Sequence, residues 1–311
     1  MRALPEQQQR GVALITVMLV VALATTAAVA MASRQQLDIR RTENVLYAGQ
    51  ASMYLLGVED WAKQFLAQDR KDNSIDHAGE DWATRLPPLP VEGGQVQGTL
   101  DDLQGRFNLN ALAQTGDKGK TARQRLRRLL QTLDLDPELA NTVQDWVDAD
   151  PEPRFPGGAE DGVYLGQEPF YRSANRPMTS PSELLLLQGM SFDDYEKLRP
   201  HVTALPPETP LNINMASAEV LASLADGLPL RELEALVKKR ADNPYDKVGD
   251  FLAERVFAGK QIPLEGLSVG SDYFVLRAQA DIGHVHRSQV SLLRRDSKGR
   301  VVTLQRSGTA L

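Results

Sequence analysis

The sequence of 311 residues contains no cysteine. It therefore forms no disulfide, uses no thiolate nucleophile and offers no Cys ligands to a structural zinc ion. Histidine is scarce, with four residues, and aromatic residues make up only 6% of the total. Hydrophobic residues account for 42% and charged residues for 24%, values that are typical of a globular protein with a real core.

An excess of basic residues is also missing, because the formal net charge is −6. Binding to nucleic acid depends on many contacts between Lys or Arg and phosphates, so this charge argues against general affinity for a phosphate backbone. The sequence contains no nucleophile elbow, no HExxH motif and no paired carboxylates on a recognisable catalytic scaffold. We expect neither an enzyme nor a nucleic-acid partner.

One long hydrophobic run stands near the N-terminus, where residues 12–33 form 22 consecutive positions without a charge. As a helix this run is about 33 Å long, enough to cross the hydrocarbon core of a bilayer. It exceeds the apolar stretch of a cleaved secretory signal, so we expect a retained transmembrane segment. Arginines flank it on both sides, and the positive-inside rule therefore leaves its orientation open.

The polar leader ends at Arg10-Gly11, and the apolar run follows directly from Val12. This arrangement resembles a prepilin-type signal, in which a membrane peptidase cleaves after the glycine on the cytoplasmic side and the new N-terminus is methylated. Processing would thus fall between Gly11 and Val12. An ordinary single-pass anchor with a glycine at this position by chance is the alternative.

The helix is expected to continue beyond the membrane to about Ala67, because no proline follows until Pro87. Apolar residues recur here at alternating steps of four and three, which places them on one face of a helix. We expect this face to pack on a soluble domain. The stripe consists of Tyr47, Ala51, Tyr54, Val58, Trp61 and Phe65.

The remaining sequence predicts an α+β fold. Strand candidates occupy 273–280, 285–293 and 300–305, and the stretch 95–110 is expected to form strands broken by Gly98 and Gly105. The pattern between these β regions is helical. We therefore expect a long N-terminal helix on a small antiparallel sheet, with a large all-α domain inserted into it.

The inserted region contains a recurring unit of two helices joined by a short turn. Asn108-Leu109-Asn110 and Asn212-Ile213-Asn214 introduce two such units 104 residues apart, and a capping box at 180–183 starts another. These units resemble helix-hairpin-helix (SAM-like) motifs. In DNA-binding versions the turn is rich in glycine and exposes amides to a phosphate, whereas the turns 134–137 and 226–229 here carry carboxylates.

The segment 145–175 is strongly acidic, with seven carboxylates against two arginines. A hard cation that takes six to eight oxygens would neutralise such a loop, and calcium is the natural candidate. The spacing begins like an EF-hand, but Pro153 and Ala159 occupy positions that need Gly and Glu. Composition alone leaves a solvated acidic loop as an equal alternative.

Three stretches carry a resemblance to a known family: RGVALITVMLVVALA, DWVDADPEPRFPGGAEDGVYL and YRSANRPMTSPSELLLLQGM. With the single long helix, the flanking strands and the helical insertion, they resemble the general secretion pathway protein K family. These proteins are large minor pseudopilins of bacterial type II secretion systems. The resemblance extends over essentially the whole sequence.

The resemblance implies a role and a set of partners. The protein would cap the tip of the periplasmic pseudopilus and initiate its assembly for export of folded proteins across the outer membrane. Its partners would be the minor pseudopilins of the I, J and H types, the major pseudopilin and the prepilin peptidase, with the secretin and secreted substrates as further contacts. The helix stripe is the expected surface for other pseudopilins.

The resemblance also implies localisation and organisation. The protein would span the bacterial inner membrane once, with its bulk in the periplasm. The expected segments are a leader (1–11), a transmembrane helix (12–33), the periplasmic helix with the first strands (34–110), an inserted α-domain (111–262) with the acidic loop, and C-terminal strands (263–311).

Two structural calcium ions are implied in the helical domain. The ligands are assigned from the oxygen supply of the matching loop: Asp148, Asp150, Glu160, Asp161, Glu168 and Asn175. A membrane-tethered helix-hairpin-helix DNA receptor of the competence type is the alternative function.

One position departs from ordinary pilin-like subunits. These carry Glu at the fifth mature residue, where it neutralises the N-terminal amine of the preceding subunit in a low-dielectric core. Counting from Val12, the fifth residue here is Thr16. A subunit with nothing above it needs no such carboxylate, so Thr16 favours the tip position.

Overall fold

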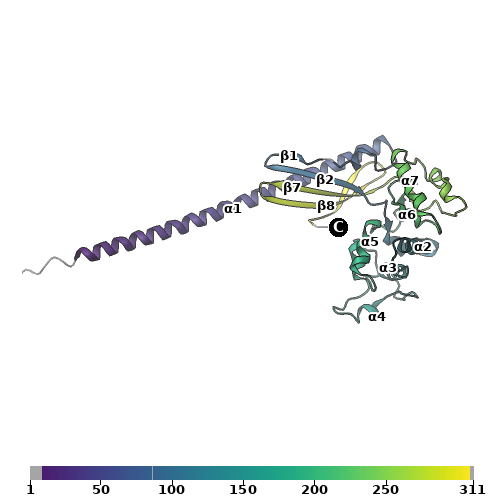
Figure 1. Cartoon of the computed structure of the whole chain (residues 1–311), viewed down its shortest axis with the longest axis horizontal. Helices are drawn as coiled ribbons and strands as arrows, with labels where there is room; N and C mark the ends of the chain where they lie inside the picture. The colour runs from purple at the N-terminus through teal and green to yellow at the C-terminus, as the bar shows by residue number, and fades with distance from the viewer. Residues whose placement is uncertain (1–8, 86, 309–311) are drawn as a thin grey trace, which may run out of the picture.

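The computed structural model describes residues 9–85 and 87–308, so most of the expected leader lies outside the described residues. Its longest element is α1 (Gln9–Asp72), a continuous helix of 64 residues whose first turns contain Gly11 and Val12. The N-terminal part of α1 projects from the molecule as a bare rod (Figure 1). Among the described residues, it is the one helix that is long and apolar enough to cross a membrane. The predicted continuation of this helix into the soluble domain is confirmed.

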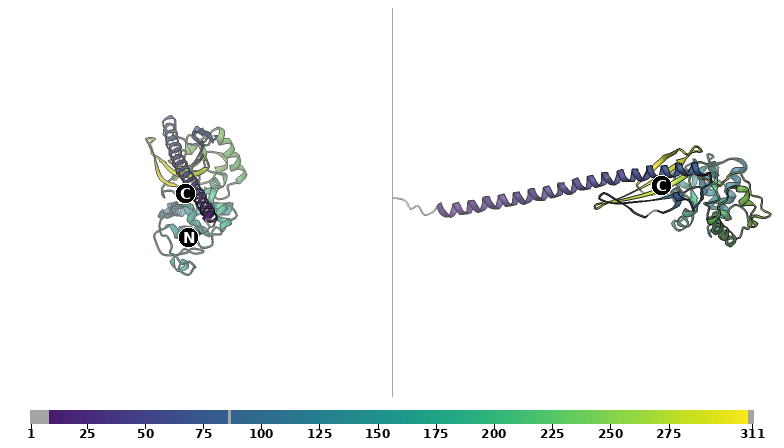
Figure 2. Two further views of the ribbon diagram at one scale, coloured as in Figure 1. Left: turned by 90° about the vertical axis from the view of Figure 1, so that its left-hand side faces the viewer. Right: turned by 90° about the horizontal axis from the view of Figure 1, so that it is seen from above.

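The C-terminal half of α1 lies along a five-stranded antiparallel sheet (Figures 1 and 2). The strands follow one another in the order β1 (Leu89–Val91), β2 (Gly94–Asp102), β7 (Tyr273–Ile282), β8 (Val285–Arg295) and β9 (Val301–Ser307). The three C-terminal strand predictions are therefore confirmed. Because β2 and β7 are neighbours, the whole insertion leaves and re-enters the sheet at adjacent strands.

Apolar side chains from α1 and from one face of the sheet form the first core. Ala51, Leu55 and Leu66 of α1 are buried against Phe274 and Leu276 of β7. Full burial of a Leu or Phe side chain contributes about 1.5–3 kcal/mol, so this spacing of three and four residues along α1 fixes the helix on the sheet.

Gly98 lies inside β2, which corrects the prediction of a strand break at this glycine. A Cβ atom at Gly98 would lie 3.0 Å from Cγ1 of Val58, so the missing side chain allows α1 to cross close to the strand. Gly105 does separate two strands, since β2 ends at Asp102 and β3 (Phe107–Asn108) begins after it.

The insertion is a helical domain at the end of the sheet far from the N-terminal end of α1 (Figures 1 and 2). Its first half contains β3, η2 (Leu109–Ala113), α2 (Gly116–Thr132), α3 (Leu139–Val147), α4 (Asp161–Tyr164), η3 (Pro181–Leu186), α5 (Phe192–Leu198), η4 (Arg199–His201) and β4 (Val202–Thr203). Its second half contains β5 (Leu211–Asn212), α6 (Ala218–Ala222), α7 (Leu230–Asp242), α8 (Val248–Leu252), η5 (Arg255–Phe257) and β6 (Leu267–Ser268). A further short helix, η1 (Asp81–Ala83), precedes β1.

Each half is closed by a short parallel strand pair. β3 pairs with β4, and β5 pairs with β6. One continuous apolar core runs through both halves, so they form a single helical domain. Ser180 is an N-cap as predicted, because its side chain accepts a hydrogen bond from the Ser182 amide. The full capping box is not seen, since this bond does not reach the Glu183 amide and Glu183 accepts from Thr179, and the element is the 3-10 helix η3 rather than an α-helix.

Candidate functional site

The predicted helix stripe packs against the sheet of its own subunit. Ala51 is fully buried, and Tyr47, Tyr54 and Val58 are half-buried in the core under α1. Trp61 meets Phe65 edge to face with ring centroids 4.8 Å apart, and it is the exposed member of the stripe. The sequence interpretation as core packing is confirmed, while the assignment of the whole stripe to partner subunits is corrected, because the protein's own sheet occupies it.

A second apolar stripe lies on the opposite face of α1, where the sheet does not reach. Ile39, Leu46 and Met53 are spaced by seven residues and are between 51% and 69% exposed. Leu56 falls on the same face, as does Gly49, whose Cβ position has no atom within 4 Å. Heptad spacing of apolar residues is typical of a helix that packs along another helix. This outer stripe is an apolar surface that the fold leaves free on the half of α1 that carries the sheet.

A buried carboxylate joins α1 to the sheet at Glu59. Its side chain accepts hydrogen bonds from Ser291 (2.7 Å) and Thr303 (2.6 Å) and a bidentate pair from Arg306 (both 2.8 Å), while Lys63 Nζ lies 2.7 Å from it. Burial alone raises the pKa of Glu59, but the donors outweigh it and hold this pKa well below its usual range. Glu59 is therefore a charged clamp between α1, β8 and β9.

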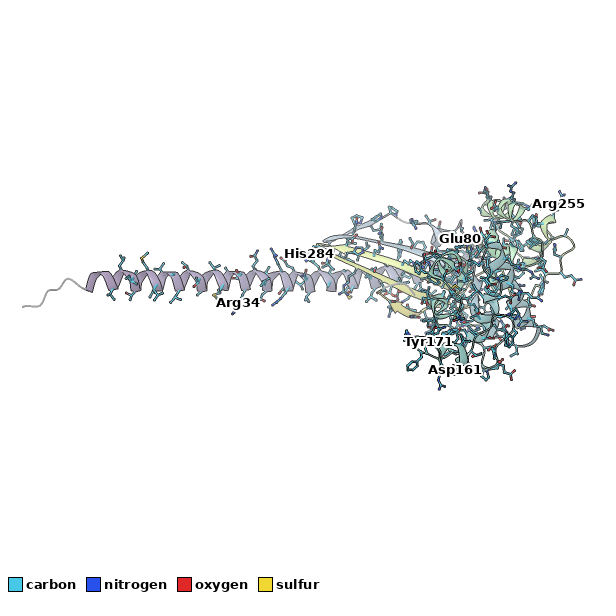
Figure 3. The ribbon with its side chains drawn as sticks, turned by 60° about the horizontal axis from the view of Figure 1, so that its bottom comes forward. Arg34, Glu80, Asp161, Tyr171, Arg255 and His284 are labelled. Atoms are coloured by element: carbon cyan, nitrogen blue, oxygen red, sulfur yellow. The ribbon has the colours of Figure 1, made fainter. Side chains whose placement is uncertain are left out.

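The acidic loop brings four of its side chains together at the end of α3. Asp145 and Asp148 stand one turn apart at this helix end, and both are buried. Glu160 precedes α4 and is also buried. Asn175 joins them in a left-handed backbone conformation (φ 43°), which asparagine tolerates better than most residues. Asp161 and Tyr171 mark this region on the surface of the insertion (Figure 3).

Each carboxylate of this group has at least one oxygen without a hydrogen-bond donor. Asp145 Oδ1, Asp148 Oδ1 and Glu160 Oε1 are buried without a hydrogen-bond partner among the described residues. The Asn175 amide faces three acceptors, with Ser173 Oγ at 2.8 Å and Glu160 Oε2 and the Asp145 carbonyl oxygen at 3.3 Å. With its NH2 group turned toward them, Asn175 donates to all three acceptors.

The charges of the group are incompletely neutralised. Arg154 is the nearby cation, with Nη2 at 2.9 Å from Asp148 Oδ2 and Nη1 at 3.5 Å from Asp145 Oδ1. Burial raises the pKa of Asp148 to about 6 and that of Glu160 to about 7, and the neighbouring carboxylates add to both shifts. Burial likewise raises the pKa of Asp145. One guanidinium therefore serves several carboxylates, and their hard oxygens are of the kind that calcium prefers.

The other three predicted ligands lie outside this group. Asp150 accepts from the Glu152 amide and lies 3.8 Å from Arg154. Asp161 accepts from the Ser173 amide at 3.0 Å. Glu168 is exposed on the loop. The structure thus brings together Asp148, Glu160 and Asn175 of the six, and it adds Asp145, which the ligand prediction omitted although its spacing from Asp148 places both on one helix face.

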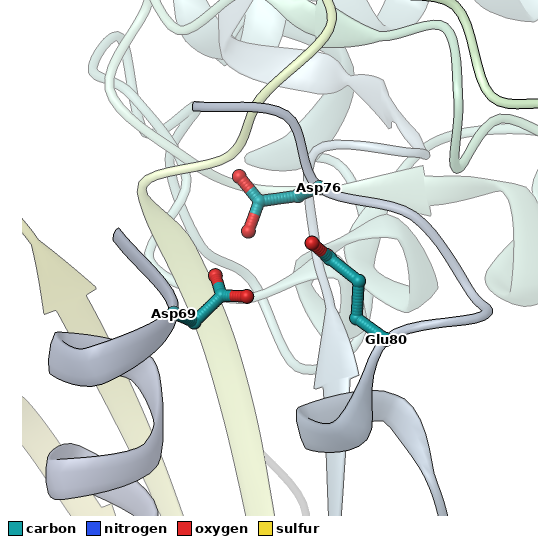
Figure 4. A group of neighbouring side chains, drawn as sticks. All are labelled: Asp69, Asp76 and Glu80. Carbon is teal, nitrogen blue, oxygen red and sulfur yellow. The ribbon is translucent and has the colours of Figure 1, made fainter. Parts of the chain in front are cut away.

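A second carboxylate cluster lies where α1 ends. Asp69, Asp76 and Glu80 place oxygens within 4.8 Å of one another (Figure 4). Arg295 fills this cluster, with Nη1 at 2.6 Å from Asp69 and Nη2 at 2.5 and 2.6 Å from the two oxygens of Asp76. Burial raises the pKa of Asp76, and Arg295 opposes this effect.

Glu80 accepts hydrogen bonds from three donors: Asn73 Nδ2, the His77 amide and Trp82 Nε1. Each carboxylate here therefore has its own donors, whereas each of Asp145, Asp148 and Glu160 in the acidic loop leaves an oxygen without one. The cluster is a structural ion pair that joins α1, the following loop and β8. No local pattern indicated it, because Arg295 lies more than two hundred residues from its partners.

A long apolar helix laid on an antiparallel sheet, with its N-terminal part free to enter a membrane, defines a pilin-like subunit. Two family models described as "Type II secretion system (T2SS), protein K" match the insertion, over residues 105–207 and 211–270. The boundary between them coincides with the segment that joins its two halves. The protein belongs to the type II secretion system protein K family.

Relatives match over nearly the whole length. Type II secretion system protein K of Pseudomonas aeruginosa is 37% identical over 96% of this protein and 92% of its own length. The protein of the same name from Klebsiella pneumoniae is 34% identical over 97% of both. One subunit in the crystal structure of the GspK-GspI-GspJ complex from the type 2 secretion system of enterotoxigenic Escherichia coli aligns with a TM-score of 0.78 at 29% identity, over 87% of this protein and all of that subunit.

These matches confirm the predicted family, the α+β fold class and the function as a minor pseudopilin of type II secretion. The competence-type DNA receptor finds no support among them. The apolar N-terminal helix is compatible with single-pass anchoring in a membrane.

Proposed function

We propose that this minor pseudopilin caps the tip of the periplasmic pseudopilus and initiates its assembly. In this proposal α1 is anchored in the inner membrane, the bulk of the protein lies in the periplasm, and the tip faces the secretin and the secreted proteins. The observation that carries the proposal is the position of the insertion. It occupies the space beyond the end of α1, where the next subunit of a helical stack would lie (Figure 1).

Thr16 supports the same position. Its hydroxyl donates to the Val12 and Ala13 carbonyls at 3.0 and 2.9 Å, so it is satisfied inside α1 and presents no charge to a neighbour. A charged residue at this point would need a partner in the low-dielectric surroundings of a membrane or filament core. A subunit without such a residue fits the end of the filament, where no amine from a subunit above requires it.

Labelling of filament ends tests the tip position. Sheared pseudopili are treated with a gold-conjugated antibody against the insertion and viewed by electron microscopy. We expect one label at one end of each filament. Labels spread along the filament would contradict the proposal, because they would place this protein inside the stack.

The outer stripe of α1 is the proposed contact with other pseudopilins. The solved GspK-GspI-GspJ complex places a similar subunit with two further ones, and we extend this to the I, J and H types and the major pseudopilin here. The stripe is apolar, exposed and heptad-spaced, and Gly49 permits close approach of a second helix. Burial of this stripe would remove an apolar surface that the monomer leaves in water.

Charge substitution on the outer stripe tests this contact. Leu46→Arg and Met53→Arg place a cation in the interface and should weaken co-purification of the I- and J-type subunits about tenfold or more. Glu43→Arg is the matched control, since Glu43 is exposed on the same helix about 90° around its axis from the centre of the stripe. Equal loss with the control would mean that charge on α1, and not the stripe, governs assembly.

Processing by the prepilin peptidase is proposed between Gly11 and Val12. Its support is the polar leader that ends directly before the apolar part of α1. The intact mass of the protein from membranes of cells with and without the peptidase tests it. Loss of residues 1–11 and a gain of one methyl group should occur only with the peptidase.

We further propose that the acidic loop binds structural calcium. Asp145, Asp148, Glu160 and Asn175 would hold an ion, because they supply buried oxygens without donors. Asp150, Asp161 and Glu168 lie outside this group and would have to approach it to supply the carboxylate oxygens that a second ion requires. Calcium would supply positive charge to the loop. The protein itself holds the loop at the end of α3, because the Arg154 amide and the Ser173 hydroxyl both donate hydrogen bonds to Asp145.

A further inference from the structure

A cleft of about 470 Å³ opens between the two halves of the insertion. Elements β3 and α2 line it from the first half, and the segments 207–211 and 263–266 line it from the second. Arg125 of α2 is part of its wall. Gly266 stands beside this arginine, since a Cβ atom there would lie 3.9 Å from Arg125 Nη1.

Arg125 lacks a partner within the part of the protein that the structure describes. Its Nε and Nη2 atoms are buried and make no hydrogen bond to any described residue. Burial lowers the pKa of Arg125 to about 10, and the neighbouring Arg128 adds to this shift. A buried charge without a counter-charge costs several kcal/mol, so a protein normally pairs it.

Other enclosed arginines of the protein have hydrogen-bond partners, and two of them pair with carboxylates. Arg295 contacts Asp69 and Asp76, and Arg128 makes a bidentate pair with Asp226 at 2.5 and 2.9 Å. Arg240 donates to two backbone carbonyl oxygens. The unpaired guanidinium of Arg125 therefore stands out, and its place in the wall of a cleft indicates that the counter-charge comes from outside the subunit.

The charges around the cleft limit the class of anion. Lys118 is already paired with Glu265 at 2.7 Å across it, and Arg106 is a further cation whose pKa burial lowers. Asp117 and Glu208 bring negative charge to the same lining. The lining therefore offers one unpartnered guanidinium and no larger excess of positive charge. One carboxylate matches the planar fork of this single arginine, whereas a doubly charged phosphate would bring more negative charge than it can pair.

The remaining wall combines apolar residues, such as Phe107, Leu205 and Leu211, with uncharged polar ones. A ligand with aliphatic side chains beside its carboxylate would therefore find both apolar and hydrogen-bonding contacts. The volume lies within the range of about 300–1,000 Å³ that is usual for ligand pockets. We propose that this cleft binds the carboxylate of a short apolar peptide segment, with Arg125 as its counter-charge. The carboxylate is either the free carboxyl terminus of a polypeptide or an acidic side chain between apolar ones.

Calorimetric titration of the full-length protein in detergent tests the proposal. The probes are acetyl-Leu-Val with a free carboxylate, the same peptide as its amide, and the amide of acetyl-Leu-Glu-Val. Binding of the first with no binding of the second identifies a carboxyl terminus as the source, and binding of the third identifies an acidic side chain. Failure of all three, equal binding of the amide, or tighter binding of inorganic phosphate overturns the proposal.

Variants locate the binding at the cleft. Arg125→Met should weaken peptide binding about tenfold or more, because it removes a charge-assisted bidentate contact. Arg123→Met is the matched control on the same helix, since Arg123 has its own partner in Gln144 at 3.2 Å, and it should bind as the wild type does. Without peptide, Arg125→Met should also raise the melting temperature, because an unpaired buried charge is lost. A lower melting temperature would show that Arg125 has a partner inside the subunit and would overturn the proposal, whatever the outcome for the tip position.

Discussion

Asn110 and Asn214 make equivalent hydrogen bonds in the two halves of the insertion. Asn110 accepts from the Met178 amide (2.7 Å) and donates to the carbonyls of Met178 and Leu205 (both 2.9 Å). Asn214 accepts from the Tyr245 amide (3.0 Å) and donates to the carbonyls of Tyr245 and Val269 (2.9 and 3.4 Å). Each asparagine side chain thus supplies the hydrogen bonds that a neighbouring strand would otherwise give to the backbone of distant segments. The repeated Asn-x-Asn sequence is the signature of this shared structural role.

Substitution of either asparagine should destabilise the insertion. Asn110→Ala leaves one buried amide and two carbonyls without partners, and we expect a loss of about 2–3 kcal/mol in the free energy of unfolding. Asn214→Ala should give a similar loss. Chemical denaturation followed by circular dichroism measures it. Asn243→Ala, at an exposed position after α7, is the control and should change stability by only a few tenths of a kcal/mol.

The Glu59 clamp predicts an acid-sensitive junction between α1 and the sheet. Because hydrogen bonds and cations hold the folded-state pKa of Glu59 below its usual value, the clamp contributes fully above a pH of about 4.5, and its contribution falls as the pH drops toward the folded-state pKa. At neutral pH, Glu59→Gln should cost about 3 kcal/mol.

Measurement of the free energy of unfolding from about pH 7 to about pH 2.5 tests this direction of the pH dependence. The difference in stability between the wild type and Glu59→Gln should shrink as the pH falls below about 4.5. Asp60→Asn is the matched control, since Asp60 is the next residue, is exposed and pairs with the same Lys63 at 3.2 Å. A difference that stays constant with pH would exclude Glu59 as the titrating group.

Calcium should stabilise the protein through the acidic loop. At a calcium concentration about one hundred times the dissociation constant, we expect a gain of about 2.7 kcal/mol, which corresponds to a rise of roughly 5–10 °C in the melting temperature. A chelator should reverse it. Scanning calorimetry with calcium, magnesium or chelator provides the measurement.

Asp148→Asn and Glu160→Gln should each remove most of the calcium effect. Glu196→Gln, on the exposed face of α5, is the matched control and should respond to calcium as the wild type does. If calcium has no effect on the wild type, Arg154 alone neutralises the loop and the calcium proposal is wrong.

Loss of Arg295 should destabilise the junction at the end of α1. Arg295→Met leaves Asp69 and Asp76 buried without their main partner, at a cost of about 3–5 kcal/mol. The double variant Arg295→Met/Asp76→Leu should recover part of this loss, because it removes one of the stranded charges. Thermal unfolding of the two variants compares them, and a double variant less stable than the single one would contradict this account.

Much of the architecture was predictable from local patterns. The charge-free run and the stripe at steps of three and four indicated α1, and strand-forming residues bounded by turn residues indicated the C-terminal strands. Gly98 was misinterpreted because its cause is not local. Gly98 is required because Val58, some forty residues away on the helix that crosses the strand, leaves little space for a side chain at this position.

The sequence indicated where the acidic site lies, but not which of its residues come together. The density of carboxylates indicated the calcium loop, yet which of them become buried depends on how the loop folds back on α3. Glu168 stays exposed, whereas Asp145 is enclosed. The partner surface was misplaced for a similar reason, because two apolar stripes run along α1 and only the tertiary structure decides which one the sheet covers.

The clamps at Glu59 and Arg295 have a mechanical consequence. They fasten α1 to the sheet at two separate levels, and the adjacent strands β2 and β7 lead from there into the insertion. A force applied along the axis of α1 would therefore be transmitted through the sheet to the helical domain, because both clamps hold α1 rigidly on the sheet. The insertion would therefore move together with α1, and a displacement of the N-terminal part of α1 along its axis would displace the insertion as well.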